Sequence, residues 1–258
     1  MLSKATIKYW LRSRSLRFTL DRDTRARARP QSRYVWRRKP IYYRPGTSDI
    51  ELIYKVLLKS GSKAEYSVPN WLKPRVVLDI GGNIGIASIY FAYHFPEARV
   101  YSFEPVPDNV ALLRKNTAPY PNIQVCPVAL GADDGGFDMN ASDDPHNFGG
   151  FSFFEQGSDT QRKLRVEQRN PKTLFRELGV DQVDLIKIDT EGAEYDILTA
   201  FDQDMLRRTT WITGELHGEK DFELLAFLSP WFEIAARKTM GKRLFMFTAV
   251  NRSMAERL

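Results

Sequence analysis

The stretch that decides the fold is VVLDIGGNIG, residues 76–85. Its first half is an apolar run bounded by Pro74 and by a glycine pair, which is the pattern of a strand buried on both faces. The glycines allow a tight turn into a helix and let a ligand approach the backbone closely. Free N–H groups at the start of such a helix favour an anionic group, such as a carboxylate. The stretch therefore predicts a parallel α/β sheet with a ligand-binding loop at its carboxyl edge.

Strand and helix patterns alternate along the chain from residue 41 onward. The predicted strands are 41–43, 76–80, 99–104, 123–128, 183–189, 210–216, 232–237 and 244–249. The predicted helices are 49–58, 84–94, 107–117, 171–178, 192–201 and 219–228. Such alternation with short connections predicts a mostly parallel sheet with helices on both faces.

One segment, 132–168, breaks this alternation and is rich in Gly, Asp and Phe. It predicts a hairpin-like excursion. Its aromatic stretch at 147–154 is either a wall of an acceptor pocket or an edge hairpin that packs its own phenylalanines.

The composition is that of an ordinary globular protein, with 43% hydrophobic and 27% charged residues among 258. A single cysteine, Cys126, excludes a disulfide within the chain and a cysteine-rich zinc site. The sequence contains no apolar stretch of transmembrane length and no apolar core of the signal-peptide kind near its start. We therefore expect a cytoplasmic protein.

Charge divides the chain into two parts. Residues 1–44 contain 14 basic and two acidic residues, a net charge of +12, whereas the other 214 residues contain 24 basic and 30 acidic residues, a net charge of −6. We expect a basic extension over 1–40 and a catalytic domain over 41–258. Within the extension, residues 21–40 have the composition of a linker or loop.

Residues 1–20 combine five basic residues with apolar and aromatic ones and contain no acid. They predict an amphipathic helix on an anionic surface, with peripheral membrane association, or a short organelle-targeting segment. The alternatives are a solvated arm or a helix packed on the body.

The glycine-rich loop has an acidic partner, Glu104, at the end of the next strand and 19 residues beyond Gly85. A carboxylate at that position can accept hydrogen bonds from both hydroxyls of a ribose. A dinucleotide loop counted from Gly81 would need glycine at positions 83 and 86, which are Asn83 and Ile86. The loop instead fits the pattern D-x-G-x-N-x-G, which is typical of S-adenosylmethionine-dependent methyltransferases, with Asp79 placed to meet the ligand's ammonium directly or through water.

Two further strand ends carry groups suited to proton transfer. Asp189 and Glu191 follow the strand at 183–189, where they could bind a substrate hydroxyl, accept its proton or bind a cation. His217 follows the strand at 210–216, and a neutral imidazole near pH 7 is a competent general base. Asp189, Glu215 and His217 could together bind Mg²⁺, but we expect no metal. The alternatives are acids that complement a helix dipole, as we expect for Glu194, and a structural histidine.

Taken together, several motifs resemble the FkbM family of methyltransferases over about residues 41–250. These motifs are RPGTSD (44–49), DIGGNIG (79–85), FEP (103–105) with Asn109, VALG (128–131), KIDTEGAE (187–194) and ELH (215–217). Gly82 replaces the alanine that is often found in the loop. The resemblance implies a Rossmann-like class I fold, a seven-stranded sheet whose last strand is antiparallel, and S-adenosyl-L-methionine as the methyl donor. It also implies O-methylation of a hydroxyl on a sugar, a polysaccharide or another natural product, so that the partner is a small-molecule or glycan acceptor.

The resemblance also assigns roles to individual residues. It implies donor binding by Asp79, Gly81, Gly82, Asn83, Gly85, Glu104, Pro105, Asn109 and Ala129. Our hypothesis for catalysis is that His217 or Asp189 is the base, and that Glu191 and Lys187 orient the acceptor.

Three other functions compete with this one. An NAD(P)-linked oxidoreductase is disfavoured by Asn83 and Ile86. A nucleic-acid (RNA) methyltransferase would use the basic extension to follow phosphates. A non-catalytic module would bind the nucleoside without turnover.

Overall fold

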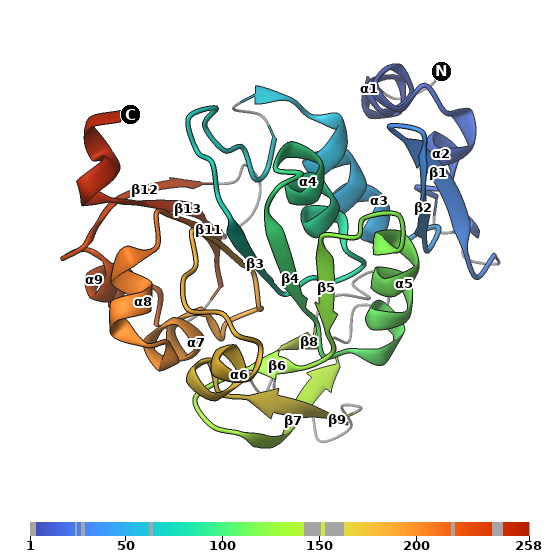
Figure 1. Ribbon diagram of the computed structural model, residues 1–258. Coiled ribbons are helices and arrows are strands. Elements are labelled where there is room, and N and C mark those ends of the chain that lie inside the picture. Colours follow the sequence, from blue (N-terminus) through green and yellow to red (C-terminus); the bar gives the residue numbers. More distant parts are fainter. Residues whose placement is uncertain are drawn as a thin grey trace.

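The computed structural model describes residues 4–23, 25–26, 29–61, 64–141, 151–152, 163–217, 220–238 and 245–257. At its centre is a seven-stranded sheet with the order β12-β13-β11-β10-β3-β4-β5 (Figure 1). Its strands are β3 (Val76–Ile80), β4 (Arg99–Phe103), β5 (Ile123–Cys126), β10 (Leu185–Ile188), β11 (Trp211–Leu216), β12 (Phe232–Lys238) and β13 (Phe245–Asn251).

All sheet neighbours are parallel except those of β13, which runs antiparallel to both β11 and β12. The chain builds outward from β3 through β4 to β5, and then returns to the other side of β3 with β10. Such a reversal of strand order opens a crevice at the carboxyl ends of the strands, which is where ligands of open α/β sheets bind. The predicted Rossmann-like sheet, with its last strand antiparallel, is confirmed.

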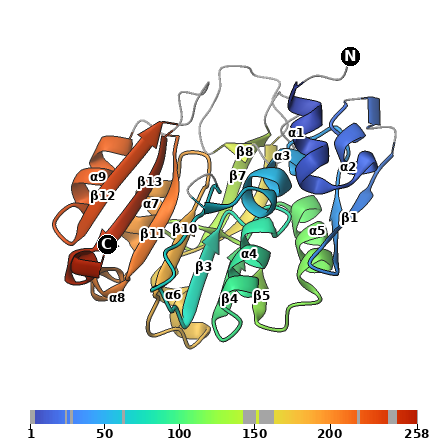
Figure 2. The same cartoon turned by 90° about the horizontal axis from the view of Figure 1, so that it is seen from above.

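Helices cover both faces of the sheet (Figures 1 and 2). One face carries α3 (Asp49–Ile53), the π-helical turn η2 (Tyr54–Leu58), α4 (Ile86–His94) and α5 (Pro107–Thr117). The other carries α6 (Pro171–Glu177), α7 (Glu194–Ala200), α8 (Gln203–Arg208) and α9 (Asp221–Leu228). A 3₁₀ helix, η4 (Arg252–Arg257), follows β13.

Neighbouring strand residues belong to different apolar clusters because their side chains alternate between the faces. Val77 and Leu185 belong to the cluster under α4, whereas Leu78 and Ile186 belong to the cluster under α7. This double burial explains why the central strands β3 and β10 are apolar apart from the paired Asp79 and Lys187.

The predicted excursion forms a small sheet with the order β6-β9-β7-β8. Its strands are β6 (Ala129–Leu130), β7 (Gly135–Ala141), β8 (Phe151–Ser152) and β9 (Lys163–Arg169). β7 and β9 pair antiparallel, so the hairpin prediction is confirmed for the described residues. Most of the aromatic stretch at 147–154 lies outside them.

The N-terminal elements are α1 (Lys4–Ser13), α2 (Leu16–Leu20), β1 (Ser32–Trp36) and β2 (Lys39–Tyr43). The expectation of a linker or loop over 21–40 is wrong for its second half, because β1 and β2 pair as an antiparallel hairpin. β1 is alternately buried and exposed, so Tyr34 and Trp36 pack inward while Arg33 points outward. The charge of this segment obscures a period-2 strand pattern. Residue 40 separates parts of different charge, but it does not separate two hydrophobic cores, because elements on both sides of it share one apolar cluster.

Several element boundaries differ from those predicted. α4 begins at Ile86 rather than at residue 84, because Asn83 and Gly85 take left-handed backbone conformations with φ of 47° and 89°. α7 begins at Glu194 rather than at residue 192, after Glu191 and Gly192, which also have positive φ. The helix α8 was not predicted. No described helix is long and apolar enough to cross a bilayer.

Candidate active site

A cleft opens at the carboxyl ends of β3, β4 and β10. Its walls come from the β3–α4 loop, the residues after β4, the residues after β10, and the α3–η2 segment on the far side. Most of the predicted donor-binding residues line it, namely Gly81, Gly82, Asn83, Glu104, Pro105 and Ala129. This is the crevice that the strand order creates.

The glycine-rich loop passes directly against the end of β10. Gly81 has a φ of 81°, and a Cβ there would collide with the backbone oxygen of Asp189. Only glycine combines a positive φ with so close an approach to another backbone without strain. The loop and the strand end of Asp189 are therefore in contact.

Asp79 lies behind the loop and does not line the cleft. It is fully buried and forms an ion pair with Lys187, with 3.1 Å between Oδ1 and Nζ. Nζ of Lys187 also donates a hydrogen bond to the carbonyl oxygen of Gly81 at 2.6 Å. In this geometry Asp79 and Lys187 position the loop. The predicted contact of Asp79 with the donor's ammonium, and the predicted part of Lys187 in orienting an acceptor, stay predictions.

Glu104 is held rigidly at the cleft. Its carboxylate accepts hydrogen bonds from the backbone N–H groups of Asn83 and Val106, at 2.8 and 2.9 Å, and from Nδ2 of Asn109 at 3.3 Å. Burial raises the pKa of Glu104, and these three hydrogen bonds oppose the rise. Two carboxylate oxygens provide about four acceptor positions, so with three of them occupied the group can accept about one further hydrogen bond from a ligand.

Gly85 and Asn109 act from outside the cleft. Gly85 is the N-cap of α4, where its positive φ turns the chain into the helix. Asn109 is buried and links Glu104 to Arg44, because its Oδ1 accepts a hydrogen bond from that guanidinium at 2.9 Å. Arg44 in turn forms an ion pair with the buried Asp49. The RPGTSD motif thus supports the carboxylate of Glu104.

A further feature of the cleft is the amide oxygen of Asn83. Oδ1 of Asn83 is buried, and among the described residues it forms no hydrogen bond. A buried amide oxygen without a partner is costly in free energy, so it marks a place where a ligand N–H or O–H group fits.

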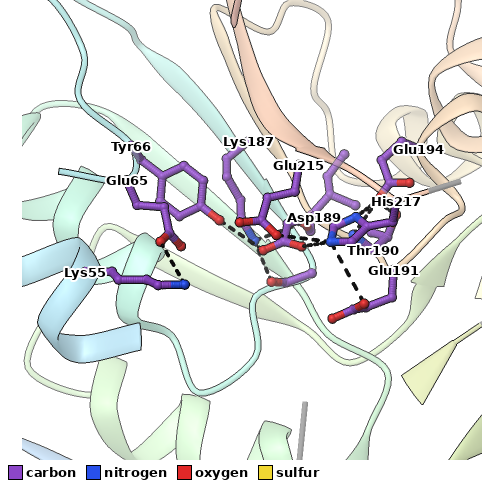
Figure 3. Close-up of polar contacts among 12 residues, drawn as sticks. Lys55, Glu65, Tyr66, Lys187, Asp189, Thr190, Glu191, Glu194, Glu215 and His217 are labelled. Carbon is purple, nitrogen blue, oxygen red and sulfur yellow. Dashed lines mark hydrogen bonds and ion pairs between the residues drawn. The ribbon is translucent and has the colours of Figure 1, made fainter. Parts of the chain in front are cut away.

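An acidic group of side chains forms the wall beside β10 and β11 (Figure 3). Oδ2 of Asp189 accepts a hydrogen bond from the hydroxyl of Tyr66 at 3.0 Å. Nδ1 of His217 lies 3.3 Å from Oε1 of Glu194, and its Nε2 lies 3.1 Å from Oε2 of Glu215. Nε2 is also 3.7 Å from Asp189 and 3.9 Å from Glu191. The structure therefore brings together Asp189, Glu191 and His217, as the sequence predicts.

These carboxylates change the protonation state of His217. Burial alone would lower its pKa, but hydrogen bonds to Glu194 and Glu215 and the charge of Asp189 raise it to about 11. This geometry favours the imidazolium over the neutral imidazole near pH 7, and the role of His217 as the base stays a prediction. His217 does not line the cleft itself. It lies behind Asp189 and Glu215, which do, and as an imidazolium it would stabilise their negative charge.

The carboxylates in the wall titrate at different pH values. Burial opposes ionisation of Asp189, but the charges of Lys187 and His217 and the Tyr66 hydrogen bond lower its pKa below the usual value. Burial and the charge of Asp189 raise the pKa of Glu191 to about 7. A carboxylate with that pKa can exchange a proton near neutral pH.

Three residues that line the cleft were not predicted from the sequence. Lys55, Glu65 and Tyr66 line it, and Nζ of Lys55 lies 3.5 Å from Oε2 of Glu65. Burial raises the pKa of Glu65 to about 7, against the lowering effect of Lys55. The i,i+4 pair of Glu51 and Lys55 on the predicted helix was the available signal. Glu65 and Tyr66 carry none, because an irregular segment brings them to the cleft.

Asp189, Glu215 and His217 also offer ligand atoms that all lie within 4.8 Å of one another. That spacing suits a divalent cation, but it also suits the direct hydrogen bond between Glu215 and an imidazolium. The absence of a metal stays a prediction.

Comparison with known proteins now identifies the family. The model of the methyltransferase FkbM domain matches residues 79–249. The chain belongs to the FkbM methyltransferase family. It is therefore a methyltransferase, and the predicted resemblance is confirmed.

The curated relatives include enzymes of different size. The 2-O-methyltransferase NoeI of Sinorhizobium fredii is 29% identical over 64% of this chain and 75% of its own length. Methyltransferase 1 of Beauveria bassiana is 25% identical, over 64% of this chain and 72% of that protein. The AMB antimetabolite synthetase AmbE of Pseudomonas aeruginosa is 28% identical over 57% of this chain, which spans only 8% of that protein.

Solved structures with a similar fold include the fibrillarin pre-rRNA processing protein of Methanococcus jannaschii. It covers 86% of this chain and 82% of its own, with a TM-score of 0.47 and 13% identity. Because this score is below 0.5, the family assignment depends on the sequence match.

Proposed function

We propose that this methyltransferase uses S-adenosyl-L-methionine to methylate a hydroxyl group on a sugar, a polysaccharide or another natural product. The observation that supports it best is the convergence of three features in one cleft. These are the glycine-rich loop at Gly81, the fixed carboxylate of Glu104 and the acidic wall around Asp189. The name of the relative NoeI, a 2-O-methyltransferase, agrees with an oxygen acceptor.

The residues present fit the donor. Glu104 has about one acceptor position left for a ribose hydroxyl, and Oδ1 of Asn83 is buried without a partner among the described residues. Gly81 and Gly82 let a ligand approach the backbone closely. When bound, S-adenosyl-L-methionine supplies an electrophilic methyl group on a positively charged sulfur.

The chain itself has to position the hydroxyl and accept its proton. Asp189 is ionised throughout the physiological range, so it can orient the hydroxyl by accepting its hydrogen bond. The sequence favours His217 or Asp189 as the base, but the carboxylates around His217 favour its protonated form, and the lowered pKa of Asp189 makes it a weak base. The pKa of Glu191 favours that residue as the proton acceptor.

The donor site can be tested by calorimetric titration with S-adenosylhomocysteine. Glu104→Gln keeps the shape but removes the charge, and a charged hydrogen bond contributes about 1.5–3 kcal/mol. We expect at least a tenfold loss of affinity, whereas Glu97→Gln, an exposed change on the same protein, leaves the affinity unchanged. No heat of binding to the wild-type protein, or equal affinity of both variants, would contradict the site.

The acceptor requires a separate screen with radiolabelled methyl groups. We expect incorporation into hydroxyl-bearing sugars, glycans or other natural products, at a product bond that resists base as an ether does. Incorporation into RNA alone would support the nucleic-acid alternative. Donor binding without turnover on any acceptor would support the non-catalytic module.

A further inference from the structure

Exposed apolar side chains are concentrated at one corner of the molecule. Among the described residues, nine large hydrophobic side chains are exposed, and five of them belong to α1 and α2. They are Ile7, Trp10, Leu11, Leu16 and Leu20, with exposed fractions between 44% and 63%. A monomeric protein rarely leaves neighbouring large apolar side chains uncovered unless they bind something.

The exposed residues of α1 lie on one face of the helix. Residues advance by about 100° around a helix, which places Ile7, Trp10 and Leu11 on one side. The opposite side packs on the body, where the ring of Tyr9 stacks on Tyr54 with 3.8 Å between centroids. The face therefore stays exposed because the helix is already docked through its other side.

Basic residues surround these apolar side chains. Lys4 and Lys8 of α1 are exposed, as are Arg14 and Arg17 on and before α2. Residues 1–20 contain no acidic residue that could offset them. An apolar stripe flanked by cations is typical of a helix that lies in the interface of an anionic membrane.

We propose that α1 and α2 form a docking surface for an anionic lipid bilayer. Four of the five exposed apolar side chains are aliphatic, which makes a nucleic acid a poor partner for this surface, because single-stranded nucleic acids bind through aromatic stacking platforms and cations. The charge disfavours a second copy of this chain, because like surfaces of net positive charge repel. Figure 2 shows α1 and α2 together at the edge of the molecule, outside α3 and α5.

The docking surface is adjacent to the active site. α1 packs on η2 through Tyr9 and Tyr54, and Lys55 of η2 lines the cleft. Docking would thus place the cleft wall one helix away from the lipid surface. The proposal does not depend on the methyl-transfer reaction, because lipid binding can be measured without donor or acceptor.

Vesicle flotation of the full chain tests the proposal. We expect at least tenfold stronger binding to vesicles of phosphatidylcholine with 30% phosphatidylglycerol than to phosphatidylcholine alone, and weaker binding at high salt. The double variants Leu11→Ser with Trp10→Ser, and Lys4→Glu with Lys8→Glu, should each bind about tenfold more weakly.

Matched control variants distinguish binding through this surface from non-specific adsorption to vesicles. The apolar control is Phe222 on α9, which is 83% exposed, and the basic control is the exposed Lys172 on α6. Both lie outside α1 and α2, so Phe222→Ser and Lys172→Glu should leave vesicle binding within twofold of wild type. Far-UV circular dichroism and the Tm of each variant report that it is folded. The proposal is overturned by equal binding to both vesicle types, by variants that bind as wild type does, or by binding to an RNA oligonucleotide in place of vesicles.

Discussion

Glu191 is the residue whose ionisation should set the pH dependence of the reaction. Its pKa is raised to about 7 by burial and by Asp189, and it accepts a proton only as the carboxylate. We expect kcat/KM to rise about tenfold between pH 6 and pH 8 and then to level off. Measuring the profile with saturating donor checks this expectation.

Two variants separate Glu191 from its neighbour across the cleft. Glu65 also has a pKa of about 7, so the rise alone does not identify the base. Glu191→Gln should abolish the rise together with most of the activity, whereas Glu65→Gln should keep it. A Glu191→Gln enzyme with the wild-type profile would rule Glu191 out.

His217 should contribute to stability in a pH-dependent way. Its folded-state pKa of about 11 lies above the ordinary value of 6.5, because Glu194, Glu215 and Asp189 stabilise the imidazolium. The contribution is therefore complete below about pH 6.5 and declines as the pH rises toward 11. His217→Gln should lower the Tm, and the gap to wild type should be larger at pH 6 than at pH 9.

Thermal unfolding of both proteins across that pH range measures the gap. The control is His94→Gln, the same substitution at an exposed histidine outside the acidic wall. A gap for His217→Gln that stays constant or widens toward pH 9 would mean that His217 is neutral in the folded protein.

At the scale of elements, the β3–α4 turn depends on the close approach of Gly81 to the end of β10. Gly81→Ala combines a positive φ with a collision against the backbone oxygen of Asp189. We expect it to destabilise the protein by about 4 kcal/mol or more, or roughly 8–16 °C in Tm. Gly179 also has a positive φ but open space around it, so Gly179→Ala should cost only about 1–2 kcal/mol. Equal losses in the two variants would show that the crowding at Gly81 is unimportant.

The elements differ in how far the sequence predicts them. The doubly buried strands β3 and β10 are apolar apart from Asp79 and Lys187, so their positions follow from sequence alone. β1 is short, half exposed and rich in arginine, so composition suggests a loop where cross-strand pairing makes a strand. Helix starts are displaced by two residues wherever left-handed residues extend the preceding loop, as they do before Ile86.

The candidate site was predictable to the extent that it lies at strand ends. Glu104, Asp189 and His217 are brought together by sheet order, which the alternation of strands and helices predicts. The protonation of His217 was not predictable, because it depends on buried carboxylates that converge from separate elements. Tyr66 comes from an irregular segment, and no periodic pattern places such a segment.

For the whole molecule, the decisive question is whether the basic N-terminal residues fold together with the catalytic part. Phe18 is almost fully buried, and its ring packs on Tyr34 and Tyr43 with centroid distances of 4.7 and 5.5 Å. These residues lie outside the matched family domain of 79–249 but belong to the same apolar cluster as Ile86 and Val100, which lie inside it. A shared core makes the chain one cooperative unit, so Phe18→Ala should lower the free energy of unfolding by about 3–5 kcal/mol.

Urea unfolding followed by fluorescence and by circular dichroism tests this expectation. Phe18→Ala should show a single transition at a lower urea concentration than wild type. The control Leu16→Ala, at an exposed position, should change the free energy of unfolding by less than about 0.5 kcal/mol. An early separate transition in Phe18→Ala, with the main one unmoved, would instead make the N-terminal elements an independent unit on the methyltransferase domain.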